Sequence, residues 1–260
     1  MYPQFLVFLP LLLLLLWRFV IIYVMVPANI KSQPLWKATS KYLPFDPATL
    51  GPEVVNFFHS HVVALTAQGF VVIQYLTKPE AQKNLTTVMI YLVNRERGER
   101  CTVACFYVTT QAYTKVKGHN VILTTRFDDD TAITTSNVTS VGSFRKRPTI
   151  DSVSIADLTD PTALVNVHRF RVAKLADGKR PIIPPSGVEV EDFEAYERTA
   201  VDYQVTAGLA YFDEREQAYI RTWYGAFYMT WQLLWPFKQI NLARKRSKAD
   251  TVMKEFLRTR

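Results

Sequence analysis

The sequence predicts an α+β fold, in which an antiparallel sheet of about five strands is arranged as a meander and flanked by helices. Three observations predict it. A leucine-rich apolar run opens the chain, five runs rich in Val, Ile, Thr, Tyr and Phe follow one another between residues 70 and 139, and helical patterns lie on either side of them. Strands grouped together and helices grouped together favour α+β over an alternating α/β architecture.

The N-terminal segment 1–28 is predicted to be a transmembrane anchor. Phe5 to Val26 is interrupted only by Pro10 and Arg18, and as a helix it reaches about 33 Å, enough to cross a hydrocarbon core. Arg18 costs roughly 2.5 to 3.5 kcal/mol at a helix centre, which the leucines offset at about 0.3 to 0.6 kcal/mol each. The alternative is a cleaved signal peptide, but Met1 to Gln4 carries no basic residue.

A proline-punctuated connector, 29–46, leads to an α+β domain predicted to span 47–215. The apolar residues recur at helical spacing from Pro52 to Gln68, where Gly69 ends the pattern. The composition then becomes typical of strands. The expected strands are Phe70 to Thr77, Thr86 to Asn94, Cys101 to Gln111, Val121 to Phe127 and Ala132 to Thr139.

The connectors between these runs are short, so neighbouring strands should be antiparallel, because a parallel crossover needs a dozen residues or more. The expected turns are Lys78-Pro79-Glu80, Arg97-Gly98-Glu99, Lys117-Gly118-His119-Asn120 and Asp128-Asp129-Asp130.

Two helices are predicted after the sheet. Asp160-Pro161 resembles an N-cap followed by proline at the first helical position, and Asp177-Gly178 stops that helix. From Phe193 to Ala207 the apolar residues repeat at spacings of three and four, which predicts a second amphipathic helix.

Few residues suggest catalysis. His168, His119, Asp128 and Asp130 form the only plausible catalytic set, and each has a structural interpretation: His168 as a buried histidine, the aspartates as a polar turn. No phosphate-binding, dinucleotide-binding or zinc-protease motif occurs, so neither a cofactor nor a metal site is predicted. Cys101 and Cys105 would lie about 13 Å apart along one strand, too far for a disulfide.

Residues 216–242 form an aromatic segment with three interpretations: a helix lying in the membrane interface, a second transmembrane helix, or a core helix. Its apolar run, 222–235, would reach only about 21 Å as a helix, and Trp and Tyr prefer the headgroup boundary. A basic tail, 243–260, follows and suits anionic headgroups. The residues expected at the membrane interface are Arg18, Arg221, Trp223, Tyr224, Trp231, Trp235, Lys238, Arg244, Lys245, Arg246 and Lys248.

The charge distribution predicts the topology. The net charge is +8, and Lys31, Lys37 and Lys41 follow the apolar run, whereas nothing basic precedes it. The positive-inside rule therefore favours a single-pass membrane protein with its main domain in the cytoplasm, over a two-pass arrangement that exposes the domain outside.

These features favour a membrane-anchored protein without a catalytic role, whose α+β domain binds a protein partner or lipid at the membrane surface. A membrane-tethered enzyme that uses the four candidate residues is one alternative, and it requires their side chains to converge in one pocket. A lipid carrier, in which the meander encloses an apolar cavity, is another. Nucleic-acid binding is not predicted, because the excess of basic residues lies in the tail rather than across a domain face.

Overall fold

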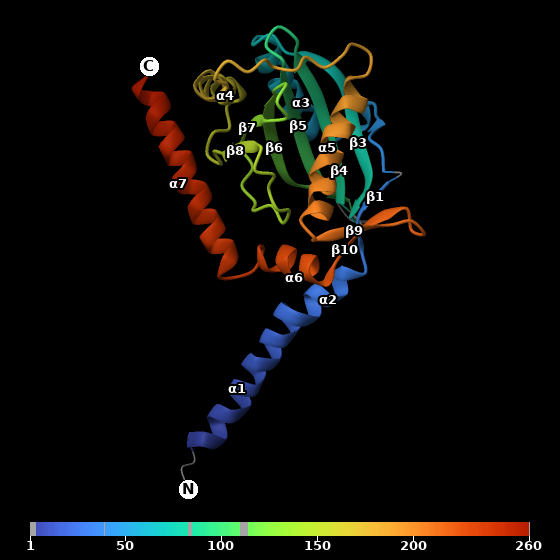
Figure 1. Cartoon of the computed structure of the whole chain (residues 1–260), viewed down its shortest axis with the longest axis vertical. Helices are drawn as coiled ribbons and strands as arrows, with labels where there is room; N and C mark the ends of the chain where they lie inside the picture. Colours follow the sequence, from blue (N-terminus) through green and yellow to red (C-terminus); the bar gives the residue numbers. More distant parts are fainter. Residues whose placement is uncertain (1–3, 39, 83–84, 110–113, 260) are drawn as a thin grey trace. The chain divides into compact units, whose positions relative to one another are not determined.

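The computed structural model describes residues 4–38, 40–82, 85–109 and 114–259. The fold is α+β, with one sheet of seven strands and another of three (Figure 1). The chain divides into two compact units, each built from three separate segments. The anchor unit comprises Met1–Thr39, Val141–Arg145 and Arg198–Leu242, and the sheet unit comprises Ser40–Ser140, Lys146–Glu197 and Ala243–Arg260.

The anchor unit begins with an apolar helical segment. It consists of α1 (Gln4–Val20), the π-helical turn η1 (Ile21–Met25) and α2 (Val26–Lys31). Within the described residues, one helix, Leu9–Lys31, is long and apolar enough to cross a membrane. The structure thus contains the apolar helix predicted from the sequence, and it continues past residue 28, where the anchor was predicted to end.

A small antiparallel sheet follows this helix in the anchor unit. Its strand order is β1-β10-β9, from β1 (Pro34–Lys37), β10 (Ala218–Arg221) and β9 (Ala210–Asp213). This sheet was not predicted from the sequence, because its strands are four residues long and β1 lies far from the other two in the sequence. Tyr219 and Ile220, expected at the start of the aromatic helix, lie in β10 instead.

The aromatic helix α6 (Trp223–Trp231) is nine residues long, about 14 Å, which is well short of the hydrocarbon thickness. The peptide bond between Trp235 and Pro236 is cis. The next helix, α7 (Phe237–Arg258), includes most of the segment predicted as a basic tail.

The larger sheet has the order β2-β3-β4-β5-β6-β7-β8. The five predicted strands are present, consecutive and antiparallel, but the prediction of a five-stranded antiparallel meander is wrong for the whole sheet, which is mixed. β8 pairs with β7 in parallel, and the short β2 adds a strand beside β3. The strands are β2 (Leu43–Pro44), β3 (Val71–Gln82), β4 (Leu85–Asn94), β5 (Glu99–Thr109), β6 (Thr114–Arg126), β7 (Ala132–Ser136) and β8 (Ile150–Ser154).

Two of the predicted turns are wrong. Lys78-Pro79-Glu80 lies inside β3, where the register with β4 shifts between Lys78 and Gln82, and Lys117-Gly118-His119-Asn120 lies inside β6, where Gly118, His119 and Asn120 pair with β5. The end of the run predicted as Cys101 to Gln111 falls outside the described residues. The turns at Gly98 and Asp129 are confirmed, and Gly98 has a φ of 65°, a conformation that glycine adopts without strain.

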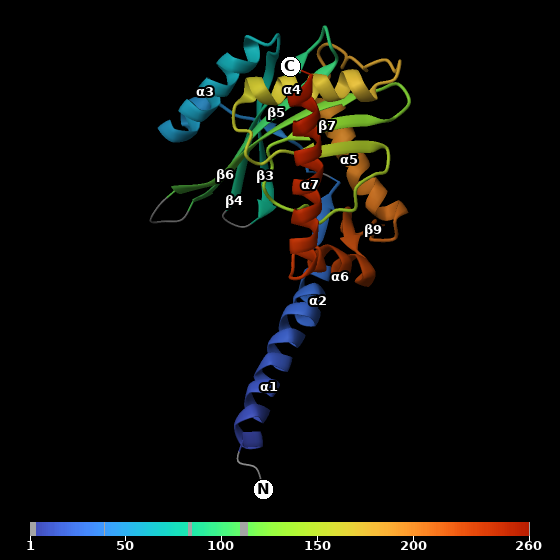
Figure 2. The same ribbon diagram turned by 90° about the vertical axis from the view of Figure 1, so that its left-hand side faces the viewer.

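Helices cover both faces of the larger sheet (Figure 2). The helix α3 (Pro52–Thr66) and the helix α4 (Pro161–Leu175) pack on one apolar face, and Phe193 at the start of α5 (Glu189–Thr206) packs on the other. The Asp160 side chain accepts hydrogen bonds from the backbone N–H groups of Thr162 and Ala163, so the predicted N-cap of α4 is confirmed.

A third apolar cluster fixes the C-terminal part of α7 to the sheet unit. Ala249 and Phe256 of α7 are buried together with Val153 of β8 and Val167 of α4. The rings of Phe256 and Phe170 lie 5.6 Å apart between centroids. Residues 243–258 are therefore a packed helix, and the space between α4 and α7 is a feature of the sheet unit.

Candidate functional site

The helix α6 presents large aromatic side chains to its surroundings. Trp223 and Tyr224 are 54% and 60% exposed, and Trp231 is also exposed. Trp235, beyond the helix, is 71% exposed. An exposed aromatic cluster of this size is typical of a surface that contacts a membrane or another molecule.

The opposite side of α6 is fixed to the small sheet of the anchor unit. Thr222 caps the helix, because its hydroxyl oxygen accepts a hydrogen bond from Gly225 N at 2.9 Å. Gly225 lies so close to Leu209, the residue before β9, that a Cβ atom there would stand 1.7 Å from the backbone oxygen of Leu209. This contact and the buried Ala226 and Met229 set which face of α6 is exposed.

Hydrogen bonds connect the aromatic segment to the C-terminal part of the apolar helix within the anchor unit. The Trp231 indole nitrogen donates to the backbone oxygen of Tyr23 at 3.1 Å, and the Tyr23 hydroxyl donates to the backbone oxygen of Trp235. The Lys31 ammonium lies 5.3 Å from the centroid of the Trp223 ring.

Arg221 completes this connection. Its guanidinium donates to the backbone oxygens of Ile30 at 3.3 Å and Gln33 at 2.9 Å, just where the helix gives way to β1. Burial lowers the pKa of Arg221 from its usual value. Arg221, predicted as a membrane-interface residue, therefore joins parts of the anchor unit, whereas Arg18 and Lys238 are exposed.

A hollow of about 470 Å³ adjoins the exposed face of α6. Apart from Gln232, its lining is aromatic. The aromatic side chains are Tyr224, Phe227, Tyr228, Trp231 and Phe237.

The basic residues predicted for the tail divide into two groups. Lys245 donates to the backbone oxygens of Val138 at 3.0 Å and Ser140 at 2.8 Å, and Lys248 pairs with Asp151 at 3.1 Å. Arg244 and Arg246 are exposed. Two of the four predicted headgroup contacts are thus also bonded inside the sheet unit.

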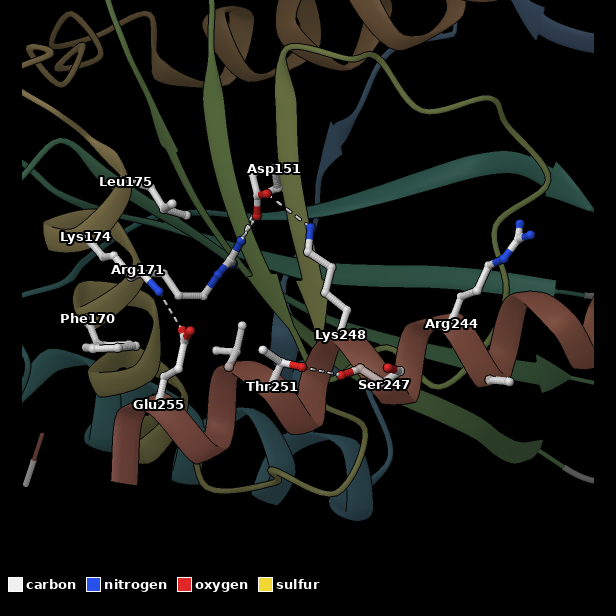
Figure 3. A pocket seen from close by; sticks show the side chains of 12 residues that line it. Asp151, Phe170, Arg171, Lys174, Leu175, Arg244, Ser247, Lys248, Thr251 and Glu255 are labelled. Atoms are coloured by element: carbon white, nitrogen blue, oxygen red, sulfur yellow. Dashed lines mark hydrogen bonds and ion pairs between the residues drawn. The ribbon is translucent and has the colours of Figure 1, made fainter. Parts of the chain in front are cut away.

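A groove of about 640 Å³ lies between α4 and α7 in the sheet unit (Figure 3). One wall carries Phe170, Lys174 and Leu175 of α4, and the other carries the side chains of α7. Two ion pairs cross it: Lys174 with Glu255 at 2.7 Å, and Lys248 with Asp151 at 3.1 Å. Charged side chains therefore connect α7 to α4 and to β8 across the groove.

The floor of the groove is a buried arginine. The Arg171 side chain is 2% exposed and donates to the backbone oxygen of Thr134 at 2.6 Å and to the Thr135 hydroxyl at 2.6 Å. It also pairs with the Asp151 carboxylate, while its Nε lacks a hydrogen-bond partner in the described part of the chain. Burial alone would raise the pKa of Asp151, but Lys248 and Arg171 outweigh it and hold that pKa below its usual value.

His168, the predicted buried histidine, lies one turn of α4 before Arg171 and is fully buried. One ring nitrogen is 3.0 Å from the Thr125 hydroxyl oxygen, and the other is 2.9 Å from that of Thr135. Burial, then the positive charges of Arg171 and Arg169, lower its pKa to about 3. The imidazole is neutral at pH 7, and both its nitrogens are used in bonds that hold α4 on the sheet.

The four catalytic candidates do not meet. His119 is exposed on β6, with its ring 4.5 Å from that of Phe57. Thr125, the partner of His168, lies six residues further along β6, which is about 20 Å. Asp128 accepts from the backbone N–H of Arg180, and Asp130 pairs with Arg147 at 2.6 Å.

The residues that the sequence analysis missed are Arg171 and Asp151, with the neighbouring Lys146. Their partners lie on other elements, so only the topology brings them together. The signal available for Arg171 was its spacing on α4, three residues after His168 and four after Val167, which places it on the same face of the helix. Among the described residues, no group of three or more His, Cys, Asp and Glu side chains is placed to hold a metal ion.

Comparison with known proteins gave no match: no family model, no curated protein and no solved structure is similar to the chain.

Proposed function

We propose that this protein is a single-pass membrane protein, whose helix Leu9–Lys31 crosses the bilayer and whose α6 lies in the membrane interface on the side of the folded domain. The observation that carries the proposal is the bonding of the aromatic segment to the C-terminal part of the apolar helix, with Trp231 bonded at Tyr23 and Arg221 bonded at Ile30 and Gln33. Exposed Trp and Tyr side chains therefore lie beside the C-terminal part of this helix, and such residues collect near the ends of membrane-spanning helices.

The alternatives for the aromatic segment are less well supported. With nine residues, α6 is too short for a second crossing, and Arg221 before it takes part in backbone bonds of the small sheet. A core helix would bury its aromatic rings, but Trp223, Tyr224 and Trp235 are exposed. The interfacial interpretation agrees with both the length and the exposure.

The same proposal assigns a binding role to the α+β domain, with lipid or a protein partner at the membrane surface as its ligand. Arg244, Arg246 and Lys238, all exposed on α7, are the side chains that we expect to contact anionic headgroups. The separation of His119, His168, Asp128 and Asp130 weighs against their acting together in one catalytic site.

Labelling with an impermeant thiol reagent tests the topology. Cys101 and Cys105 are buried and would be replaced by alanine, and single cysteines would be placed at Asp157, an exposed site, and at Thr259. In intact cells both sites should be protected, and in opened cells both should react. Opposite accessibility of the two sites, or release of the full chain from membranes at alkaline pH, would contradict the proposal.

A further inference from the structure

The groove between α4 and α7 carries an excess of positive charge at one end. Arg171 and Lys248 share a single carboxylate, that of Asp151, which is 43% exposed. Arg244, one helical turn before Lys248, also lines the groove. Figure 3 shows Arg244 and Lys248 leaving α7 on the same side.

Two more lysines add to this charge around β8, the edge strand of the sheet. Lys146 donates to the Ser152 hydroxyl at 2.7 Å. Desolvation and then the charge of Lys248 lower the pKa of Lys146, and desolvation and then the charge of Lys146 lower that of Lys245. These lysines therefore make the surroundings of the groove more positive, although the Asp151 carboxylate opposes the effect at Lys146.

The rest of the groove is apolar. Phe170 and Leu175 of α4 face Val252 of α7, and the Lys174–Glu255 pair closes the far end. The volume of about 640 Å³ lies in the range of small-molecule sites. A ligand that matches both parts carries an anionic head and an apolar chain.

We propose that the groove between α4 and α7 binds a phosphate-bearing amphiphile, with its phosphate on Lys248 and Arg244 and its alkyl chain along Phe170, Leu175 and Val252. Lys248 and Arg244 lie one helical turn apart, and a phosphate, whose several oxygens accept hydrogen bonds, can bind both when their side chains turn toward it. Arg171 acts as a positioning residue, since it holds the Asp151 carboxylate that orients Lys248. This site lies entirely in the sheet unit, so it stands even if α6 does not contact the membrane.

Octyl phosphate is the probe that tests this site. It would be titrated by calorimetry into the full chain in phosphatidylcholine nanodiscs, with inorganic phosphate and octanol as the two partial ligands. Empty nanodiscs correct for partition of the probe into lipid. We expect octyl phosphate to bind at least tenfold more tightly than either partial ligand.

Two variants of α7 give a matched comparison. Lys248→Gln removes a cation that lines the groove, whereas Lys254→Gln removes an exposed cation of the same helix that does not line it. We expect at least tenfold weaker binding of octyl phosphate for Lys248→Gln and unchanged binding for Lys254→Gln. Ser247→Trp, which fills the groove from an exposed position, should reduce octyl phosphate to the affinity of inorganic phosphate.

The opposite results would overturn the proposal. The first is no binding of octyl phosphate, and the second is equal binding of octyl phosphate by the two lysine variants. The third is binding of inorganic phosphate as tight as that of octyl phosphate, which would mean that the cations bind a free phosphate and that the alkyl chain contributes nothing. Melting temperatures of the variants within about 2 °C of the wild type would show that the comparison concerns binding and not folding.

Discussion

The indole N–H of Trp231 donates to the backbone oxygen of Tyr23 at 3.1 Å, although the two residues are 208 positions apart in the sequence. Tyr23 lies in the π-helical turn η1, a rare conformation that often marks a functional position in a helix. This bond joins the C-terminal part of the apolar helix to the aromatic segment, so both belong to one folded unit.

Arg221 should contribute strongly to the stability of the anchor unit. Arg221→Met removes the donors to Ile30 and Gln33 and should lower the free energy of unfolding by about 1.5 to 3 kcal/mol, as for a hydrogen bond to a charged group. Hydrogen exchange of the full chain in detergent should show faster exchange in β1. Arg215→Met, in the exposed turn between β9 and β10, is the control and should leave exchange in β1 unchanged.

Gly225 should not accept even a methyl group. Gly225→Ala would place a Cβ 1.7 Å from the backbone oxygen of Leu209, so α6 must move away from the residue that precedes β9. We expect a loss of roughly 1 to 3 kcal/mol or more in stability, measured by thermal unfolding. Gly142→Ala, with no atom within 4 Å of the new Cβ, should be close to neutral, and a similar loss in both variants would contradict this account.

Asp192 holds two arginines of the sheet to the start of α5. It lies 3.2 Å from the Arg100 guanidinium and 3.0 Å from that of Arg126. Asp192→Ala leaves both cations without this carboxylate and should cost on the order of 3 kcal/mol. The exposed Asp250 of α7 gives the comparison, Asp250→Ala, in the same denaturation assay, and an equally small effect of both changes would show that the network contributes little.

His168 predicts a pH dependence of stability. Its pKa falls from 6.5 to about 3 on folding, so between these values the unfolded chain binds more protons than the folded one. The contribution of His168 is complete above pH 6.5 and is lost as the pH falls toward 3, by up to about 1.4 kcal/mol per pH unit.

Thermal unfolding of the full chain between pH 7 and 5 measures this slope. His168→Gln should flatten it, whatever its effect at pH 7, and the exposed His59→Gln should leave it as in the wild type. An unchanged slope in His168→Gln would show that other groups cause the pH dependence.

Local patterns predicted much of the fold, because they act over a few residues. The N-cap at Asp160, the helix from Pro52 and the five consecutive strands are all encoded in neighbouring side chains. The parallel partner β8 and the small sheet were missed, because β8 pairs across residues 137–149 and β1 pairs with a strand near the other end of the chain.

The candidate sites also divide into residues that local composition identifies and residues that only the fold brings together. The aromatic residues of α6 could be selected from composition alone, since exposed Trp and Tyr suit an interface. Arg171 and Asp151 could not be paired from the sequence, because one lies on a helix and the other on an edge strand. Residues 243–260 were predicted as a basic tail and not as a packed helix. Ala249 and Phe256 are buried against β8 and α4, and the sequence alone does not bring these elements together.

The depth of two tryptophans tests the central claim most directly. Variants that retain only Trp17 or only Trp235 would be placed in bilayers containing lipids brominated at shallow or deep positions of the acyl chains. We predict that deep bromines quench Trp17 most, and that shallow bromines quench Trp235 most, since an interfacial helix is buried by roughly 5 to 10 Å. No quenching of Trp235 at either depth would contradict the interfacial placement of the aromatic segment, and no quenching of Trp17 would contradict the membrane span.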